Sequence, residues 1–277
     1  MIKQNPFSLY DFLGYFIPGG LMIYLFLFIE YLENLESKFE LKTFVADNSN
    51  FQLDKFLFFV IASYAIGHLL NFISSITIER YANWKYNYPS KYLLGFEIRG
   101  FWKAETRSGI LWRILLLILI FPVTILDLVL GEVFGFKNFY TRKLDKFLIA
   151  LIKFKGKKLI NKLAVGQLVE FHNDNVRVYD FNRIISHYTF EHTKSHQFRM
   201  VNYVILYGFL RTLTLISIIS FWYILIINFA EIKKAAVFLP LIIVGGISYI
   251  FFMAFMKFYR RYTLEGLMLI AIDENLK

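Results

Sequence analysis

The stretch FLGYFIPGGLMIYLFLFI, Phe12 to Ile29, contains no charged residue in 18 positions. A helix that crosses the hydrocarbon core of a bilayer needs about 20 predominantly apolar residues, so this stretch predicts a membrane-spanning helix. Pro18, Gly19 and Gly20 lie near its middle, although proline and glycine are the weakest helix formers. The stretch therefore predicts a membrane protein whose first span has a hinge at these three residues.

Two interpretations of this hinge follow from the physics of membranes. Irregular backbone at membrane depth is tolerated only where protein or a water-filled cavity surrounds it, so the first spans of several copies could gather around a shared axis as a homo-oligomer. Proline is also favourable at the first position of a helix, so Pro18 could instead begin the true span. In that case Phe7 to Ile17 lie on the membrane surface, and the span continues past Glu30.

The composition of the whole chain agrees with a membrane protein. The chain has 277 residues, of which 57% are hydrophobic and 19% are aromatic. Its mean hydropathy is +0.49, whereas soluble domains average about 45–50% apolar residues. The absence of cysteine excludes disulfides, thiolate metal sites and cysteine nucleophiles. A cleaved signal peptide is not expected, because only Lys3 precedes the first apolar run, Asp11 adjoins it and no small-residue cleavage site follows.

Four stretches are long enough to cross a bilayer core as helices. They are Phe12 to Ile29, Phe56 to Ile78, Thr212 to Ala230 and Ala235 to Met256. A fifth apolar run, ILLLILIFPVTIL from Ile114 to Leu126, has only 13 residues and contains Pro122. This length is typical of an interfacial, re-entrant or core helix rather than of a span. We therefore expect an all-α membrane protein with four transmembrane helices.

The charges between the spans predict their orientation. Residues 30–55 hold three Lys against six Asp and Glu, whereas residues 79–200 hold 20 Lys and Arg against 10 Asp and Glu. Because basic loops stay cytoplasmic, both termini and residues 79–200 are expected inside, and the acidic loop and the hairpin Glu231 to Lys234 outside. The chain then divides into a membrane hairpin (1–78), a basic, mostly helical cytoplasmic domain (79–200), and a second membrane hairpin with a cytoplasmic tail (201–277).

Within the basic region, the segment from Thr141 to Leu163 has the pattern of an amphipathic helix. Its apolar residues are spaced as one helical face: Leu144, Phe147, Leu148 and Leu151. A basic amphipathic helix can bind anionic lipid headgroups. A helix packed on its own domain, with a solvated basic face, explains the pattern equally. The candidate contacts for an anionic ligand, a lipid headgroup or an oligonucleotide, are Lys153, Lys155, Lys157 and Lys158.

The chain has no motif for phosphate-loop nucleotide binding, serine hydrolysis or zinc proteolysis, so we expect neither an enzymatic activity nor a cofactor. One weak metal candidate is present in SHYTFEHTKSHQFR, residues 186–199. His192 and His196 are four residues apart there and would share a helix face. No third ligand has a fixed spacing to this pair, and a solvated helix near the membrane explains both residues as well.

Polar residues inside the predicted spans are further candidates for function. In the second span, His68 and Asn71 share a helix face with Ser75, where they either serve a functional path or form helix–helix hydrogen bonds. Arg211 begins the third span within YGFLRTLTLIS. Because Val201 to Leu210 are nearly apolar, Arg211 lies either at the membrane boundary or deep in the membrane, and only the deep register makes it a pore or partner residue. The pore or gate candidates are thus Pro18, Gly19, Gly20, His68, Asn71 and Arg211.

Two segments of the chain resemble a known class of protein. SLYDFLGYFIPGGL (residues 8–21) and SYAIGHLLNFISS (residues 63–75) are similar to segments of bacterial multi-span membrane effectors of anti-phage defence. The nearest of these are the channel-forming effectors of Hailong systems. The resemblance covers about a quarter of the chain and carries over no functional residue. It implies a channel in the bacterial inner membrane that responds to a nucleic-acid signal.

Together these features predict an oligomeric membrane channel or membrane-perturbing effector, gated through its basic cytoplasmic domain by an anionic ligand such as a nucleotide or oligonucleotide. The alternative is a non-conducting membrane scaffold that docks cytoplasmic proteins or anionic lipid. A third interpretation is a transporter with His68 and Arg211 at its site, for which inverted repeats would be the sign. The sequence holds only a weak echo of such repeats, Pro18-Gly19-Gly20 in the first span and Pro240 with Gly245-Gly246 in the fourth.

Overall fold

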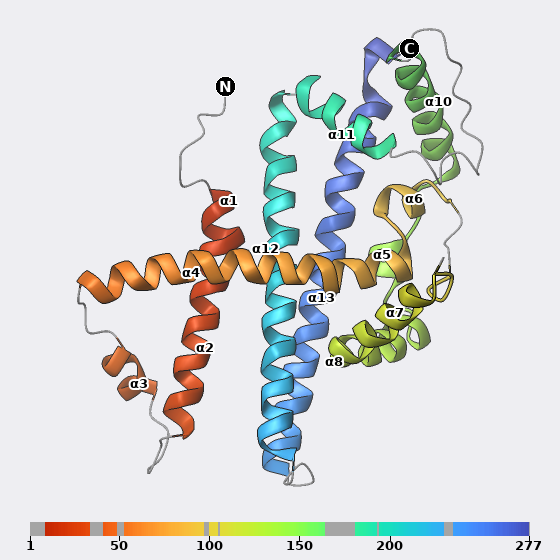
Figure 1. Ribbon diagram of the computed structural model, residues 1–277. Coiled ribbons are helices and arrows are strands. Elements are labelled where there is room, and N and C mark those ends of the chain that lie inside the picture. Colours follow the sequence, from red (N-terminus) through yellow and green to blue (C-terminus); the bar gives the residue numbers. More distant parts are fainter. Residues whose placement is uncertain are drawn as a thin grey trace.

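A computed structural model describes residues 9–33, 41–48, 53–96, 100–104, 106–163, 181–192, 194–229 and 235–276. Nearly all of these residues are helical and none is in a β-strand, which confirms the all-α prediction for this part of the chain. The elements, in chain order (Figure 1), are α1 (Leu9–Asp11), η1 (Phe12–Phe16), α2 (Ile17–Glu33), α3 (Leu41–Asn48), α4 (Leu53–Ser74), η2 (Ser75–Glu79), α5 (Arg80–Tyr86), α6 (Pro89–Leu93), α7 (Arg107–Leu119), α8 (Phe121–Leu126), η3 (Asp127–Val133), α9 (Asn138–Thr141), α10 (Lys146–Leu163), α11 (Phe181–His192), α12 (Lys194–Ile227), α13 (Ala235–Ile272) and η6 (Glu274–Leu276). The elements η1, η2 and η3 are π-helical, and η6 is a 3₁₀ turn.

In the part of the chain that the structure describes, four helical segments are long and apolar enough to cross a membrane, as the sequence predicts. They are Phe12–Tyr31, Leu53–Leu93, His196–Ile227 and Phe238–Ile272. The last three have 41, 32 and 35 residues, so they extend well beyond the predicted spans. The helices continue beyond their apolar parts. α4 runs through η2 into α5 without a break, and α12 begins before its most apolar half. The predicted hairpin at residues 231–234 lies outside the described residues.

The long helices do not lie side by side as a simple bundle. α12 and α13 form an antiparallel pair with α2 beside them, and α4 with its continuation α5 runs across all three (Figure 1). The C-terminal end of α2 lies toward the lower left of the view, the N-terminal end of α4 lies at the left at mid-height, and the adjoining ends of α12 and α13 lie at the bottom. α10, α11 and the C-terminal end of α13 lie toward the upper right.

Two clusters of buried side chains hold these helices together. The first lies where α5 and the α7–α8 segment meet α12 and α13, and its largest fully buried members are the aromatic residues Tyr81, Tyr140, Tyr249, Phe252 and Phe255. The second joins α6, α10 and α11 to the C-terminal end of α13, and it includes Leu93, Ile152, Ile185, Leu267 and Ile270. The basic region and the last long helix of the chain therefore share one core.

The crossing of α2 and α4 gives a structural reason for the glycines in the first predicted span. A Cβ atom at Gly19 would lie 1.7 Å from the carbonyl oxygen of Ser63 on α4. A Cβ atom at Gly67 of α4 would in turn lie 1.9 Å from the carbonyl oxygen of Tyr15. Because small residues let helix backbones approach closely, these two glycines permit a backbone contact that no other residue type would allow.

The chain does not break at Pro18, which differs from the expected hinge. Residues 9–33 are helical throughout, and the π turn η1 directly precedes α2. In this turn the N–H of Ile17 donates to the carbonyl oxygen of Phe12, five residues earlier. A proline ring in a regular α-helix would contact the carbonyl four residues before it, and the wider π turn relieves that contact. Pro18 and the two following glycines are buried at the helix crossing.

The fifth apolar run forms a sharp bend rather than a straight helix. α7 meets the segment Phe121–Val133, which comprises α8 and η3, at 89°. Thr106 caps α7 by accepting a hydrogen bond from the N–H of Gly109 (3.1 Å). Pro122 lies in the first turn of α8, where its missing N–H costs little. Each limb is too short to span a bilayer core, so the segment has the geometry of a broken span or a re-entrant loop.

Candidate functional site: a tyrosine pocket beside a buried arginine

Arg211 lies midway along the 34-residue helix α12, and only 6% of its surface is exposed. Its Nε donates a hydrogen bond to Ser74 Oγ (3.1 Å), and its Nη2 donates one to Asn71 Oδ1 (2.6 Å). Its Nη1 forms an ion pair with Glu79. All three partners belong to α4 and its continuation η2. The guanidinium group therefore joins α12 to the transverse helix at the point where the two helices meet.

The position of Arg211 along α12 fits the register at the membrane boundary, whereas its contacts fit the partner role that was expected of a deep register. Ile227 ends α12 about 24 Å from Arg211 along the helix axis, whereas a bilayer core is about 30 Å thick. If Ile227 lies near one face of the core, Arg211 lies near the other. Its contacts nevertheless make it a partner residue, because the charge is paired inside the protein. Such pairing is required where a buried charge would otherwise lose its hydration.

The other pore or gate candidates gather near the same crossing. Asn71 contacts Arg211 directly, whereas His68 has an exposed side chain whose ring stacks on Tyr15 at 3.8 Å between centroids. Pro18, Gly19 and Gly20 lie at the contact between α2 and α4. The structure thus brings these candidates to the junction of α4 with α2 and α12, and the cavity beside that junction is lined by other residues.

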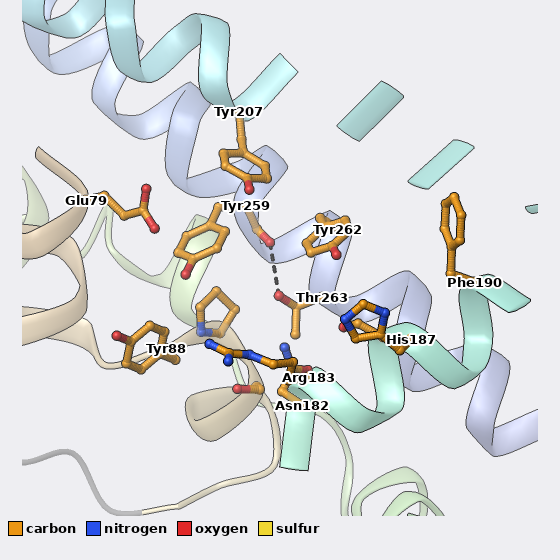
Figure 2. Close-up of a pocket in the computed structure, with 13 residues that line it drawn as sticks. Glu79, Tyr88, Asn182, Arg183, His187, Phe190, Tyr207, Tyr259, Tyr262 and Thr263 are labelled. Atoms are coloured by element: carbon orange, nitrogen blue, oxygen red, sulfur yellow. Dashed lines mark hydrogen bonds between the residues drawn. The ribbon is translucent and has the colours of Figure 1, made fainter. Parts of the chain in front are cut away.

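A cavity of about 510 Å³ lies between α11, the α12–α13 pair and the segment around α6 (Figure 2). We call it the tyrosine pocket. Its aromatic lining residues are Tyr88, Phe190, Tyr207, Tyr259 and Tyr262. Its polar lining residues are Glu79, Ser90, Asn182, Arg183, Ser186, His187 and Thr263. This volume is within the range of about 300–1,000 Å³ that is typical of sites for small organic ligands.

Helix α11 supplies the basic side of the tyrosine pocket. Arg183 and His187 are four residues apart and therefore share a helix face. Figure 2 shows Arg183 extending from α11 toward Tyr88, with His187 beside it. A guanidinium group has five N–H donors, so a contact within the protein still leaves donors for a ligand. Its planar fork matches carboxylate and phosphate groups.

Helices α12 and α13 supply the aromatic side of the pocket. The ring centroids of Tyr207 and Tyr259 are 5.2 Å apart, and those of Tyr207 and Tyr262 are 6.0 Å apart. Figure 2 shows these three rings together across the pocket from Arg183. Tyrosine combines a flat apolar ring with a hydroxyl group, so this side can bind the face of a ring and also form hydrogen bonds.

Glu79 connects the tyrosine pocket to the buried arginine. It lines the pocket and is also the ion-pair partner of Arg211. Tyr207 lies one helical turn before Arg211 on α12, so two residues of the pocket border the junction of α4 and α12. A ligand in the pocket would therefore lie next to the contact that joins two of the four candidate spans.

The four candidate lysines of α10 do not share one surface. Lys155 Nζ donates a hydrogen bond to the carbonyl oxygen of Asp273 (2.7 Å). Lys153 Nζ lies 4.4 Å from the centre of the Phe96 ring, and burial lowers its pKa. Lys157 is half-buried, and Lys158 is exposed near the ring of Phe154. Three of these lysines thus make contacts within the protein, while the apolar face of α10 packs in the core around α13.

The histidine pair is separated between two helices. His192 ends α11, where its ring stacks on Tyr188 at 4.1 Å between centroids. His196 belongs to α12, and its Nδ1 lies 2.8 Å from Glu265 Oε1 on α13. Among the described residues, no group of three His, Asp or Glu side chains is arranged to hold a metal ion.

Sequence reasoning missed the tyrosine pocket because its residues come from segments that are far apart in the chain. Only a local signal was available: Arg183, His187 and Phe190 are spaced to lie on one face of α11. Comparison of the chain with known protein families, with curated proteins and with solved structures finds no match. A function must therefore be inferred from the residues of this chain and their geometry.

Proposed function

We propose that this protein is a multi-pass membrane effector, assembled from several copies as a gated channel, and controlled by a phosphate-bearing ligand in the tyrosine pocket. One observation carries the proposal: Glu79 lines the pocket and also pairs with Arg211. A ligand that shifts Glu79 changes the contact between α4 and α12. Because both helices belong to candidate spans, binding in the pocket acts on the membrane part of the protein.

The crossed helices are compatible with four membrane crossings if the helices are tilted. The helix formed by residues 53–86 is about 50 Å long, which exceeds a core of about 30 Å and leaves length for a strong tilt. In Figure 1, the ends that the charge pattern assigns to the outer side lie at the left (α4) and toward the bottom (α2, α12 and α13), whereas α10 and α11 lie toward the upper right. We place α10, α11 and both termini on the cytoplasmic side of a bacterial inner membrane, because basic segments stay inside.

The pocket favours a ligand that carries both a phosphate group and a flat ring. Arg183 and His187 offer charged donors to phosphate, and the tyrosines opposite offer ring faces. The volume suits one nucleotide, so an oligonucleotide would place a single nucleotide in the pocket. A phospholipid headgroup could supply the same phosphate from the membrane. The binding experiment must therefore distinguish a nucleotide from a phospholipid headgroup as the source of the phosphate.

That experiment uses the full chain in lipid nanodiscs. The soluble probes are ATP and a short DNA oligonucleotide, and the lipid probe is phosphatidylglycerol added to phosphatidylcholine nanodiscs. Arg183→Ala removes the guanidinium of the pocket, and Arg261→Ala is the matched control, because Arg261 is an exposed arginine of α13 outside the pocket. We expect Arg183→Ala to weaken binding by about tenfold or more, since hydrogen bonds to charged groups contribute about 1.5–3 kcal/mol each.

The results separate the ligand sources and test the ligand hypothesis. Arg183-dependent binding of a soluble probe supports a nucleotide, whereas Arg183-dependent binding of phosphatidylglycerol alone supports a lipid headgroup. Equal binding of all probes by wild type and Arg183→Ala would refute the pocket as the site of control. Binding should also fall with increasing salt, because phosphate contacts release counterions.

A liposome flux assay tests the channel. We expect the ligand that binds the pocket to change ion flux, and we expect Glu79→Gln to alter flux in the absence of ligand, because it removes the ion pair with Arg211. If wild-type protein passes no ions with or without the bound probe, the channel must be abandoned. Ligand binding without flux would then favour the non-conducting scaffold.

A further inference from the structure

The bend between α7 and α8 exposes a continuous apolar surface. Between Ile110 and Val129, every exposed side chain is Ile, Leu, Val or Phe. Leu111 of α7 is 70% exposed, and Leu128 of η3 is 61% exposed. Exposed charged residues occur only at the two ends of the segment, Arg107 at the start of α7 and Glu132 near the end of η3. Arg113, within α7, is half-buried and donates a hydrogen bond to the carbonyl oxygen of Phe101. The bend therefore presents apolar side chains on both limbs and at its apex.

The apex of the bend rests against the most apolar parts of α12 and α13. Trp222 Nε1 on α12 donates a hydrogen bond to the carbonyl oxygen of Leu119 (2.8 Å). On α13, a Cβ atom at Gly245 would lie 3.7 Å from Pro122, an ordinary contact distance. Trp222 lies about 16 Å beyond Arg211 along α12. The apex is thus at the depth of the candidate spans and packs directly on two of them.

One limb of the bend contains a completely buried carboxylate. Asp127 is 0% exposed. Hydroxyl groups of three tyrosines donate to it, Tyr81 at 2.7 Å, Tyr86 at 2.7 Å and Tyr140 at 3.0 Å. Lys85 Nζ forms an ion pair with it at 2.9 Å. An isolated carboxylate at membrane depth is costly, and these four donors satisfy its lone pairs.

The donors to Asp127 also fix the bend to the rest of the protein. Tyr81, Lys85 and Tyr86 belong to α5, and Tyr140 belongs to α9. Gly131 packs beside the carboxylate, since a Cβ atom there would lie 2.5 Å from Asp127 Oδ1. The returning limb is therefore held on α5, which precedes the bend in the chain, and on α9, which follows it.

We propose that α7, α8 and η3 form a re-entrant hairpin, which dips into the lipid from the side of the membrane that carries α10 and returns to that side. Its exposed apolar surface contacts lipid acyl chains, and Asp127 with its tyrosine and lysine donors is the latch that holds the returning limb. This element is additional to the four candidate spans. It does not depend on a ligand in the tyrosine pocket.

The natural absence of cysteine allows a direct test on the full chain. Single variants Ile118→Cys and Leu128→Cys place a probe on each limb, and Ser108→Cys and Asn138→Cys place one at each end of the segment. Lys158 is exposed on α10, so Lys158→Cys provides a labelling position on the expected cytoplasmic side. Each variant is labelled with a membrane-impermeant maleimide in intact cells and in inverted membrane vesicles, and with a fluorophore in phosphatidylcholine–phosphatidylglycerol liposomes that contain brominated lipid.

We expect brominated lipid to quench fluorophores at residues 118 and 128, and the maleimide to react slowly there. Ser108→Cys and Asn138→Cys should react from the same side as Lys158→Cys. Labelling of these two positions from opposite sides would show a broken span and overturn the proposal. Slow labelling at residue 118 without quenching would show that protein, such as a second copy, covers the surface, and fast labelling there would show a water-exposed helix. Either result refutes lipid contact.

The latch has a separate prediction. Asp127→Leu removes every acceptor for the tyrosine hydroxyls, whereas Asp127→Asn retains an acceptor oxygen. We expect the leucine variant to speed maleimide labelling at Leu128→Cys by at least about tenfold, since several hydrogen bonds to a charged group are lost. The asparagine variant should have a smaller effect. Unchanged labelling in both variants would show that Asp127 does not hold the limb.

Discussion

Alanine at Gly19 should push α2 away from α4, whereas alanine at Gly20, one residue later, should not. A Cβ atom at Gly19 would lie 1.7 Å from the backbone oxygen of Ser63, and ordinary contact begins at 3.4 Å, so the helices must separate by about 1.7 Å. A Cβ atom at Gly20 would first meet the end of the Phe59 side chain at 3.4 Å. The Phe59 side chain can rotate to make room for this Cβ atom, whereas the backbone of Ser63 is fixed within its helix.

The two variants isolate the cost of this contact. Both replace glycine by alanine in a helix, which favours the helix by about 1 kcal/mol. Overpacking at Gly19 costs about 1–3 kcal/mol in addition, and more if the backbone resists. We therefore expect Gly20→Ala to be neutral or stabilising, and Gly19→Ala to be less stable than Gly20→Ala by about 1–3 kcal/mol.

Thermal unfolding in detergent micelles, followed by the fluorescence of the four tryptophans, measures this difference. Gly67→Ala should resemble Gly19→Ala, because its Cβ atom would lie 1.9 Å from the Tyr15 carbonyl oxygen. The flux assay should also separate the two variants if the α2–α4 contact takes part in gating. Equal unfolding temperatures for Gly19→Ala and Gly20→Ala would refute the close crossing.

Three further predictions concern the ion pair, the basic helix and the orientation. Arg211→Ala should destabilise the protein by about 3–5 kcal/mol, because it removes one partner of a buried pair, and Arg211→Ala with Glu79→Gln should recover part of that loss in the same unfolding assay. Lys158→Glu should leave the unfolding temperature unchanged, because Lys158 is exposed, whereas Lys155→Glu should lower that temperature, because Lys155 donates to the backbone at Asp273. A reporter enzyme fused after residue 45 should be active outside the cytoplasm, and one fused after residue 165 inside it; a cytoplasmic result at residue 45 would overturn the four-span topology.

The sequence was sufficient to predict the helices but not their arrangement. Long apolar runs identify spans because the bilayer core sets a minimum length. The crossing of α4 over α2 depends instead on Gly19 meeting Ser63 and Gly67, which are more than 40 positions away. Nothing local at Gly19 distinguishes a close helix contact from a hinge, since both favour glycine. The fifth run was recognised as too short to span, and Pro122 marked the place near which it bends.

The candidate site was also predicted only in part from the sequence. Asn71 and Arg211 are candidates from the sequence because they are polar residues in or beside predicted spans, and in the structure they form a hydrogen bond. Their partner Glu79 was missed, because it lies at the end of a predicted span where a charge is ordinary. The tyrosine pocket could not be predicted, since aromatic residues are abundant throughout the chain, and only the fold selects those that meet around Arg183.

The steep crossing of α2 and α4 has a mechanical consequence. Helices that lie alongside each other touch along a seam, whereas these crossed helices touch over a shorter stretch, centred on the two glycines and flanked by ring contacts of Phe59 and Tyr15. Rotation about the glycines would strain these flanking ring contacts first. A change in bilayer thickness costs a fraction of a kcal/mol per Å of hydrophobic mismatch, and helices usually respond to it by changing tilt. In a bilayer, a change in lipid thickness would therefore be expected to act on this protein through the angle between α2 and α4.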